Sequence, residues 1–404
     1  MSAAQAAPEM NSDANDERAG VSRGELERRW SLVRSYLHER DIEALVVIGS
    51  GNDLSGYVGW LIDSPIAYRS AVIFYRDDLM TLISHGSAGT IRTLDGNAPD
   101  LPGIGKVASV AAFPSVNFSQ TYEAQIALDE LRHRGITRVA FAGPLGMPHG
   151  FITSLRDGLG NALFFDITDA VDRWKAIKSA EEQNLLRDVA NMHDAVFAAL
   201  LPHIRPGFSE RDAASFAERE GRLRGGHSGV IMVGAAPTGT PAYMKPSRRQ
   251  SRILQPGDTA TVLIENAGNN GYFCELGRPV VLGPASRQLR EGFAAAQEAQ
   301  EYTLSLCKPG ALCSEIAAAY NTWLARRGFA PEHRIFAHSQ GTDLLERPLI
   351  REDEPMTIEA GMCLAVHPGI ETPGLFALIC DNYLITDRGA GGCLHATGKN
   401  IFEV

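Results

Sequence analysis

The spacing of apolar residues changes once along this chain, and that change most restricts its fold. Up to residue 170, apolar runs such as EALVVIG (43–49), SAVIFY (70–75) and RVAFAG (138–143) alternate with helical stretches. Alternation of strand and helix predicts an α/β domain with a mostly parallel sheet. Beyond residue 170 the order is helix, paired strands, two helices and strands to the end. The sequence therefore predicts a second domain of the α+β class with antiparallel strands.

A helix-start signal marks the junction of the two domains. Ser179 is followed three residues later by Glu182, the spacing of a capping box at the beginning of a helix. The small and acidic residues of the N-terminus predict a tail without order. We therefore divide the chain into a disordered tail (1–24), an N-terminal α/β domain (25–170) and a C-terminal domain (171–404).

Charge and composition exclude several classes of protein. The net charge is −10, and only short pairs such as Arg248–Arg249 supply local positive charge, so no nucleic-acid-binding stripe is present. No run approaches the roughly 20 apolar residues that span a bilayer, and the N-terminus does not resemble a signal peptide. Six cysteines without CxxC spacing are typical of reduced thiols. We expect a cytoplasmic protein without nucleic-acid or membrane partners.

Polar residues recur in strand-like surroundings at four places in the second half: VLIENAGNNGYFCELGRP, FAHSQGTDLLERP, MCLAVHPGI and ALICDNYLIT. These segments contain Glu265, Glu275, His338, His367, Cys380 and Asp381. An unpaired carboxylate in apolar surroundings is costly. Each residue has an ordinary structural explanation, such as a surface ion pair between Glu275 and Arg278. Six of them in one domain predict instead a shared pocket.

The order and the residue patterns of these segments resemble the motifs of the creatinase/prolidase/methionine-aminopeptidase family. QPGDTATVLIENAG…GYFCELGRPVVLG is similar to that family's GD-x-x-x-x-D-x-G…GY-x-x-D-x-T-R hairpin, and AHSQGTDLLERP is similar to its GHGIG…HE-x-P turn. EAGMCLAVHPGI and ICDNYLITDRGA resemble its last two motifs. The resemblance covers nearly the whole chain. It implies an α/β N-terminal domain and an α+β pita-bread domain with a curved antiparallel sheet.

The metallopeptidases of this family hold two divalent ions with Asp, Asp, His, Glu and Glu. The resemblance places Glu265, Glu275, His338, His367 and Cys380 at those positions, so only the histidine at 338 is unchanged. A two-metal centre needs carboxylates that bridge both ions, and imidazole cannot bridge in that way. We therefore expect no dinuclear centre. Two alternatives stay open: one zinc or iron ion at these five residues, or no metal cofactor, which we favour.

On this basis we expect a creatinase-like hydrolase that works without metal on a non-peptide C–N bond of a small polar metabolite, as creatinase-like and ectoine-hydrolase-like relatives do. Glu275 would be the principal acid–base or nucleophilic carboxylate, with His338, His367 and Glu265 beside it. Creatinase carries its catalytic glutamate two residues beyond the second ligand position. That place is Gly277 here, so we expect a substrate other than creatine.

Four further positions, together with Cys380, are expected to bind the substrate: Arg69, His227, Tyr243 and Glu346. Arg69 matches a creatinase arginine that crosses the dimer to hold the substrate carboxylate of the neighbouring site, a grip for which a guanidinium is suited. The resemblance therefore also implies a homodimer. Three alternatives to the creatinase-like hydrolase stay open: a mononuclear metal-dependent aminopeptidase or prolidase, a lyase, and a non-catalytic binding protein.

Overall fold

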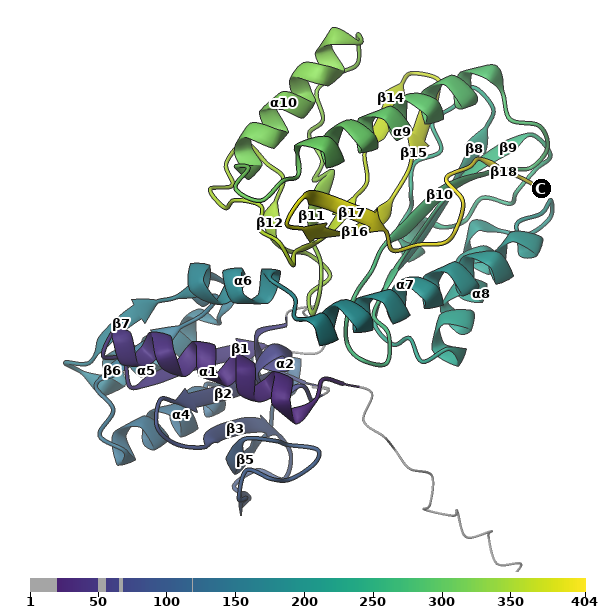
Figure 1. Ribbon diagram of the computed structural model, residues 1–404. Helices are drawn as coiled ribbons and strands as arrows, with labels where there is room; N and C mark the ends of the chain where they lie inside the picture. Colours follow the sequence, from purple (N-terminus) through teal and green to yellow (C-terminus); the bar gives the residue numbers. More distant parts are fainter. Residues whose placement is uncertain (1–19, 50–55, 65–67, 118) are drawn as a thin grey trace, which may run out of the picture.

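The computed structural model describes residues 20–49, 56–64, 68–117 and 119–404, which form two domains (Figure 1). Most of the predicted tail lies outside these residues, and the first helix begins at Arg23. Within the described ranges, no helix is both long enough and apolar enough to cross a bilayer. All six cysteines are free.

The N-terminal domain contains one seven-stranded sheet with the strand order β4-β5-β3-β2-β1-β6-β7. Five strands run parallel to one another, and β2 and β4 run against them. The strands are β1 (Ala44–Gly49), β2 (Ser70–Tyr75), β3 (Met80–His85), β4 (Ile91–Thr93), β5 (Ile104–Val110), β6 (Arg138–Phe141) and β7 (Leu163–Asp166). The helices are α1 (Arg23–Glu39), α2 (Tyr57–Ile62), α3 (Pro114–Asn117), α4 (Tyr122–His133), η1 (Pro144–Gly146), α5 (His149–Leu159) and α6 (Thr168–Ala176).

Strand β1 is apolar throughout because helices cover both faces of this sheet. Successive side chains of a strand point to opposite faces. Leu45 and Val47 accordingly pack in one core with α1, whereas Val46 and Ile48 pack in a second core with α4 and α5. This arrangement explains why the run EALVVIG lacks the polar alternation of a half-exposed strand.

The C-terminal domain packs helices around two larger sheets, ordered β18-β10-β9-β8 and β12-β11-β13-β16-β17, and a hairpin of β14 and β15. The strands are β8 (Gly229–Pro237), β9 (Asp258–Asn266), β10 (Leu276–Val281), β11 (Ala337–Ser339), β12 (Glu346–Leu349), β13 (Cys363–Val366), β14 (Gly369–Thr372), β15 (Leu375–Leu378), β16 (Asp381–Thr386), β17 (Gly389–Cys393) and β18 (Phe402–Glu403). The helices are α7 (Ala180–Leu200), η2 (Leu201–His203), α8 (Glu210–Leu223), η3 (Ser247–Arg249), α9 (Arg287–Leu306) and α10 (Cys313–Arg326).

Gly277 joins the two larger sheets. Its backbone exchanges two hydrogen bonds of 3.1 Å with the backbone of Cys380, which connects β10 to the start of β16. A Cβ atom at Gly277 would lie 2.9 Å from the Cβ of Cys380 and 3.1 Å from Leu263 Cδ1. A glutamate at this position, as in creatinase, would therefore not fit between the sheets as they lie here.

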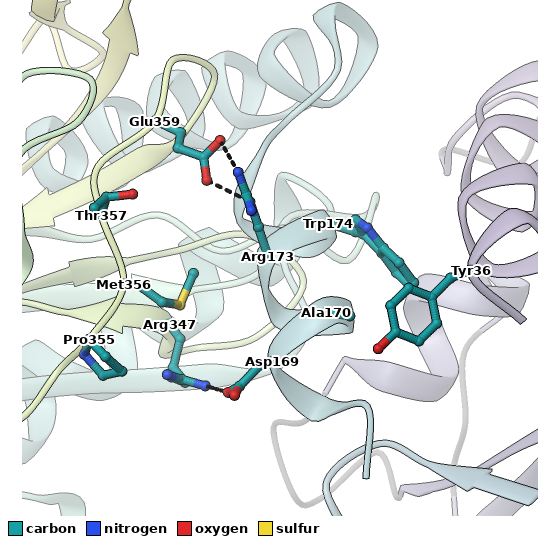
Figure 2. A pocket seen from close by; sticks show the side chains of 10 residues that line it. All are labelled: Tyr36, Asp169, Ala170, Arg173, Trp174, Arg347, Pro355, Met356, Thr357 and Glu359. Carbon is teal, nitrogen blue, oxygen red and sulfur yellow. Dashed lines mark hydrogen bonds and ion pairs between the residues drawn. The ribbon is translucent and has the colours of Figure 1, made fainter. Parts of the chain in front are cut away.

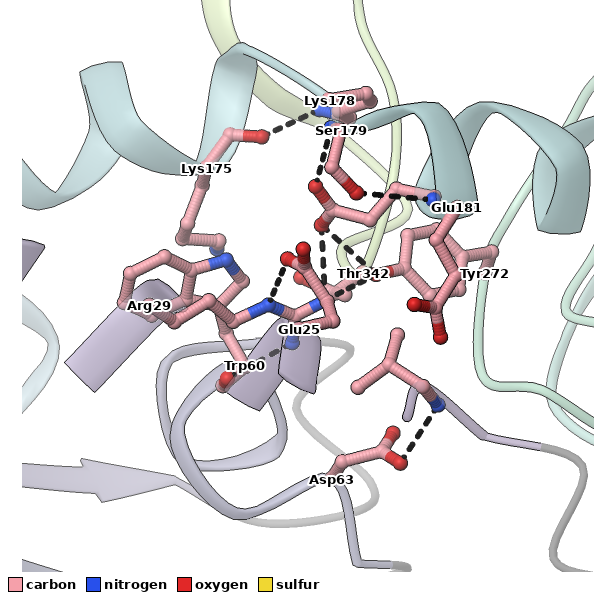
Figure 3. Close-up of polar contacts among 12 residues, drawn as sticks. Glu25, Arg29, Trp60, Asp63, Lys175, Lys178, Ser179, Glu181, Tyr272 and Thr342 are labelled. Carbon is pink, nitrogen blue, oxygen red and sulfur yellow. Dashed lines mark hydrogen bonds and ion pairs between the residues drawn. The ribbon is translucent and has the colours of Figure 1, made fainter. Parts of the chain in front are cut away.

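A buried ionic network fastens α1 of the N-terminal domain to the C-terminal domain (Figure 3). The Arg29 guanidinium donates to Glu25 Oε1 (2.8 Å), to Glu182 Oε1 (2.9 Å) and to the Tyr272 hydroxyl (2.6 Å). Tyr272 in turn donates to Glu182 Oε1 at 2.9 Å. Glu182 also completes the predicted capping box with Ser179 at the start of α7. The network therefore links the N-terminal domain to the turn that precedes Glu275.

Candidate metal centre

Three of the predicted site residues meet at the junction of the two larger sheets. Glu275 directly precedes β10, His338 lies on β11, and His367 directly follows β13. Glu275 Oε2 is 3.5 Å from His338 Nε2 and 3.8 Å from His367 Nε2. One donor atom from each residue lies within 4.8 Å of the other two. The fold thus gathers residues that are up to 92 positions apart into one cluster, the acid–imidazole cluster.

The tautomer of His338 decides what this cluster can bind. His338 Nδ1 lies 2.8 Å from the Ser339 carbonyl oxygen, which can only accept a hydrogen bond. Nδ1 therefore carries the proton, and in the neutral ring Nε2 presents its lone pair to the Glu275 carboxylate. Glu275 Oε2 and His367 Nε2 are buried, and neither has a hydrogen-bond partner among the described residues. Acceptors that face one another in this way need a cation or a proton between them.

The electrostatics of the cluster favour the states that bind metal. Burial alone would raise the pKa of Glu275, but His367 and His338 outweigh it and lower the pKa to about 2. Burial lowers the pKa of His367 to about 4, despite the nearby Glu275 charge. Near neutral pH the cluster therefore offers an ionised carboxylate and an unprotonated His367 imidazole. Metal ligands are required in these states.

Glu265 and Cys380 lie beside this cluster in a different state. Burial and the charge of Glu275 raise the pKa of Glu265 well above its ordinary value. Gln340 Nε2 donates to Glu265 Oε1 at 3.1 Å. Burial and the same charge raise the pKa of the Cys380 thiol, whose Sγ donates to the Glu275 carbonyl oxygen at 3.5 Å. Neither residue belongs to the group of converging donors.

Amide side chains that the sequence argument did not single out support the cluster. Asn382 Oδ1 accepts from the Glu275 backbone N–H at 2.6 Å, and Asn382 Nδ2 donates to Gln340 Oε1 at 2.8 Å. His395 Nε2 lies 3.2 Å from Asn382 Oδ1. Gln340 and Asn382 lie inside the quoted motifs, so their position was a usable signal. His395, in contrast, follows the last motif, and nothing in the sequence marks it.

Arg278 and Glu346 are both buried in ion pairs outside the acid–imidazole cluster. Arg278 donates to Asp381 Oδ1 at 2.6 Å in a completely buried pair, and Glu275 is not its partner. Glu346 is buried and paired with Lys178, and its Oε1 accepts from the Thr342 backbone N–H at 2.8 Å. Its contacts are therefore with the domain junction and the adjacent turn.

The other expected substrate-binding residues lie apart from one another. His227 is exposed just before β8, with Nδ1 2.9 Å from Ser228 Oγ. Tyr243 is 45% exposed, and its ring lies 5.2 Å from that of Phe376, which packs in a small apolar cluster with Cys380. Arg69 lies in the N-terminal domain and lines a cavity there. Their binding of substrate stays a prediction.

A cavity of about 470 Å³ between α6 and residues 355–359 is separate from the acid–imidazole cluster. Figure 2 shows Arg173 meeting Glu359 and Arg347 meeting Asp169 at this cavity, with closest contacts of 2.7 and 2.6 Å. These ion pairs connect α6 to the C-terminal domain. None of the three clustered donors lines this cavity, so we do not assign chemistry to it.

His193 of α7, behind the cluster, makes folding stability depend on pH. Its Nε2–H donates to the Asn266 carbonyl oxygen at 3.0 Å, and its ring stacks on that of His395 with the centroids 6.0 Å apart. Burial, followed by the charge of His395, lowers the pKa of His193 from 6.5 to about 3. Between pH 6.5 and 3, His193 is therefore unprotonated in the folded chain but protonated in the unfolded chain. This contribution to stability is complete above pH 6.5 and is lost as pH falls toward 3.

We expect His193→Gln, which keeps a donor for Asn266, to reduce the pH dependence of unfolding. Between pH 6.5 and 4.5 the parent should lose up to about 1.4 kcal/mol more per pH unit than the variant. Urea unfolding at several pH values in this window measures the difference. The control is the same substitution at the exposed His333. Parallel stability curves for His193→Gln and the parent would contradict the prediction.

Comparison with known proteins identifies the family to which this site belongs. The model described as "Metallopeptidase family M24" matches residues 184–387, about half of the chain. The chain belongs to this family. The probable dipeptidase PepE of Mycobacterium tuberculosis (strain ATCC 25618 / H37Rv) is 30% identical over 257 residues, which is 62% of this chain and 67% of that protein.

Other matches agree with this placement. The uncharacterized peptidase YqhT of Bacillus subtilis (strain 168) is 27% identical over 282 residues, 69% of this chain and 78% of that protein. The X-Pro aminopeptidase from Thermotoga maritima MSB8 superimposes with a TM-score of 0.78 at 16% identity, covering 93% of this chain and 99% of that one. The structural likeness, together with the family match, confirms the predicted pita-bread fold.

Membership of M24 corrects two expectations drawn from the sequence. A creatinase-like hydrolase that needs no metal is wrong, because the family is one of metallopeptidases and the similar proteins are named as peptidases and dipeptidases. The expectation of no cofactor is wrong with it, and the alternative of one zinc or iron ion fits better. At position 367 an imidazole replaces the family's carboxylate, and an imidazole can also bind a metal ion. Its Nε2 lies 3.8 Å from Glu275 Oε2. The hydrolysis of C–N bonds holds at the level of the family.

Proposed function

We propose that this protein is a metal-dependent peptidase with one divalent transition-metal ion per chain, held by Glu275, His338 and His367. The observation that carries the proposal is the convergence of three buried donors, two of whose atoms have no partner in the described part of the chain. Glu, His and His are the protein ligands of several catalytic zinc sites and of non-haem ferrous sites. Zinc and ferrous iron are therefore the two candidates.

The distances in the acid–imidazole cluster fit such an ion. Ligand atoms roughly 2 Å from a shared tetrahedral ion lie about 3.3 Å apart. The separations of 3.5 and 3.8 Å between Glu275 Oε2 and the two imidazole nitrogens are close to that value. His338 also donates its other ring N–H to a backbone carbonyl, as zinc-bound histidines usually do.

A divalent ion held here would act as a Lewis acid toward the substrate carbonyl and would make water acidic enough to attack near neutral pH. Glu265 would supply the proton that the leaving amine needs. Amide hydrolysis requires a proton on the leaving nitrogen as the C–N bond breaks, and we assign its donation to Glu265, whose pKa is raised by burial and by the Glu275 charge. After the C–N bond breaks, Glu265 takes up a proton from solvent, which balances the one that the attacking water releases to solvent. Gln340 and Asn382 hold Glu265 and the Glu275 backbone in place for this transfer.

We propose short peptides, and dipeptides first, as the substrates. Several similar proteins are named as dipeptidases, among them the Xaa-Pro dipeptidase of Pyrococcus horikoshii, which is 23% identical over 279 residues. A panel of Xaa-Pro and other dipeptides, assayed by release of the free amino acids, tests this part of the proposal. The homodimer expected from the sequence stays a prediction.

We expect protein purified without added metal or chelator to contain about one zinc or iron ion per chain. Elemental analysis measures the content, and dialysis against a chelator should remove the ion and the peptidase activity together. A ligand present at about 1,000 times its dissociation constant adds roughly 4 kcal/mol to stability, so the midpoint of thermal unfolding should also fall on metal removal. Less than a tenth of an ion per chain, with no change on adding zinc or ferrous iron, would refute the proposal.

A further inference from the structure

A second candidate site lies in the N-terminal domain, at the edge of the sheet where its parallel strands end. A cavity of about 210 Å³ opens there between the end of β1, the segment before β2 and the first turns of α4 and α5. Residues that line it include Ile48, Arg69, Thr121, Glu123, Gly150 and Phe151. Ligands of open α/β sheets bind in the crevice outside the carboxyl ends of the strands. The cavity therefore occupies the part of the domain best suited to a ligand.

Glu123 supplies to this cavity a buried carboxylate with one unpartnered oxygen. The residue lies in the first turn of α4 and is only 4% exposed, yet its Oε1 has no hydrogen-bond partner among the described residues. Burial accordingly raises the pKa of Glu123. A buried carboxylate oxygen without a partner costs stability unless a donor reaches it. No donor for Oε1 comes from the described chain, and a ligand would supply one.

Arg69 supplies the opposite charge. It lines the same cavity and is partly exposed, and its field acts on Glu123, but the two groups are too far apart to form an ion pair. Arg69 makes no hydrogen bond to any residue in the described ranges. A carboxylate and a guanidinium thus face one cavity without touching. A molecule with a positive and a negative end would satisfy both.

We propose that this cavity binds a free α-amino acid with a small side chain. Its ammonium group would donate to Glu123 Oε1, and its carboxylate would pair with the forked donors of Arg69. Ile48 and Phe151 would contact the side chain. The volume corresponds to roughly seven water molecules at about 30 Å³ each, which suits a small amino acid and excludes a nucleotide. The inference does not depend on the proposed peptidase activity.

Calorimetric titration of the full-length protein with L-alanine tests the proposal, with propionate and ethylamine as probes that each keep one charged end. We expect one alanine per chain, and at least about ten-fold weaker binding of either partial probe, because a charge-assisted hydrogen bond is lost. Glu123→Gln and Arg69→Gln should each weaken alanine binding at least about ten-fold. Asp129→Asn, an exposed position on the same helix, should bind as the parent does.

Binding should persist in His367→Ala, which lacks a ligand of the proposed metal centre. Loss of alanine binding in that variant would place the ligand at the metal centre and overturn the proposal. So would unchanged affinity in Glu123→Gln, or no binding by the parent at about 10 mM alanine, roughly ten times a dissociation constant of 1 mM. Glu123→Gln keeps the shape of the side chain and removes a buried charge, so it should fold. If it does not, Arg69→Gln at the partly exposed rim decides the question.

Discussion

Glu275→Gln is expected to lose the bound metal ion and to lower peptide turnover at least about a hundred-fold. The amide keeps the shape of the side chain, but it removes the negative charge that lies between the two imidazoles at 3.5 and 3.8 Å. Without that charge, two neutral ring nitrogens and an amide oxygen remain, which is a weak donor set for zinc or iron. Elemental analysis and steady-state kinetics on the same preparation measure the two losses.

Glu265→Gln is the matched control for this prediction. It makes the same chemical change on the neighbouring strand β9, but at a carboxyl group outside the converging donors, whose pKa is raised by burial and by the charge of Glu275. We expect this variant to keep its metal ion and to lose turnover through the missing proton only. Full metal content together with near-normal turnover in Glu275→Gln would leave the chemistry with His338 and His367 and would remove Glu275 from the centre.

Several helices and strands could be predicted from the sequence, because short-range features of the chain determine where they form. SAVIFY forms β2 over the same six residues, Ser70–Tyr75, and the capping box of Ser179 and Glu182 begins α7. Apolar periodicity and helix caps act over a few residues, so they can be recognised without the rest of the chain. The predicted mostly parallel sheet is a mixed one: five of its seven strands run in one direction, but the reversed β2 and β4 make three of its six strand pairs antiparallel.

The candidate site was only partly predictable, because its chemistry depends on distances between strands. The resemblance selected Glu275, His338 and His367, but it could not reveal that their donor atoms converge. Replacing a family carboxylate by His367 therefore suggested a lost metal site, whereas the structure places the imidazole nitrogen near Glu275. Nothing in the sequence marked Glu123, because the lack of a hydrogen-bond partner for its Oε1 can be recognised only from the folded structure.

Arg29→Met is expected to destabilise the protein by about 3–5 kcal/mol, the largest effect that we expect from a single substitution. Burial would lower the pKa of Arg29, but Tyr272, Glu182 and Glu25 raise it, so the guanidinium stays charged inside the protein. Methionine removes the charge and leaves Glu25 and Glu182, whose side chains are 3% and 2% exposed, without their shared buried partner. The sequence offered no sign of this, since Glu182 and Tyr272 lie 153 and 243 residues from Arg29.

Chemical unfolding monitored separately in each domain measures this effect, with Arg287→Met as the control. Arg287 makes a comparable 2.7 Å ion pair with Glu291 on α9, but its side chain is 90% exposed, so its loss should destabilise the protein far less than the loss of Arg29. In Arg29→Met combined with Glu182→Gln, part of the lost stability should return, because the second change removes an uncompensated charge. A cost for Arg29→Met no larger than that of the control would mean that the buried network does not hold the two domains together.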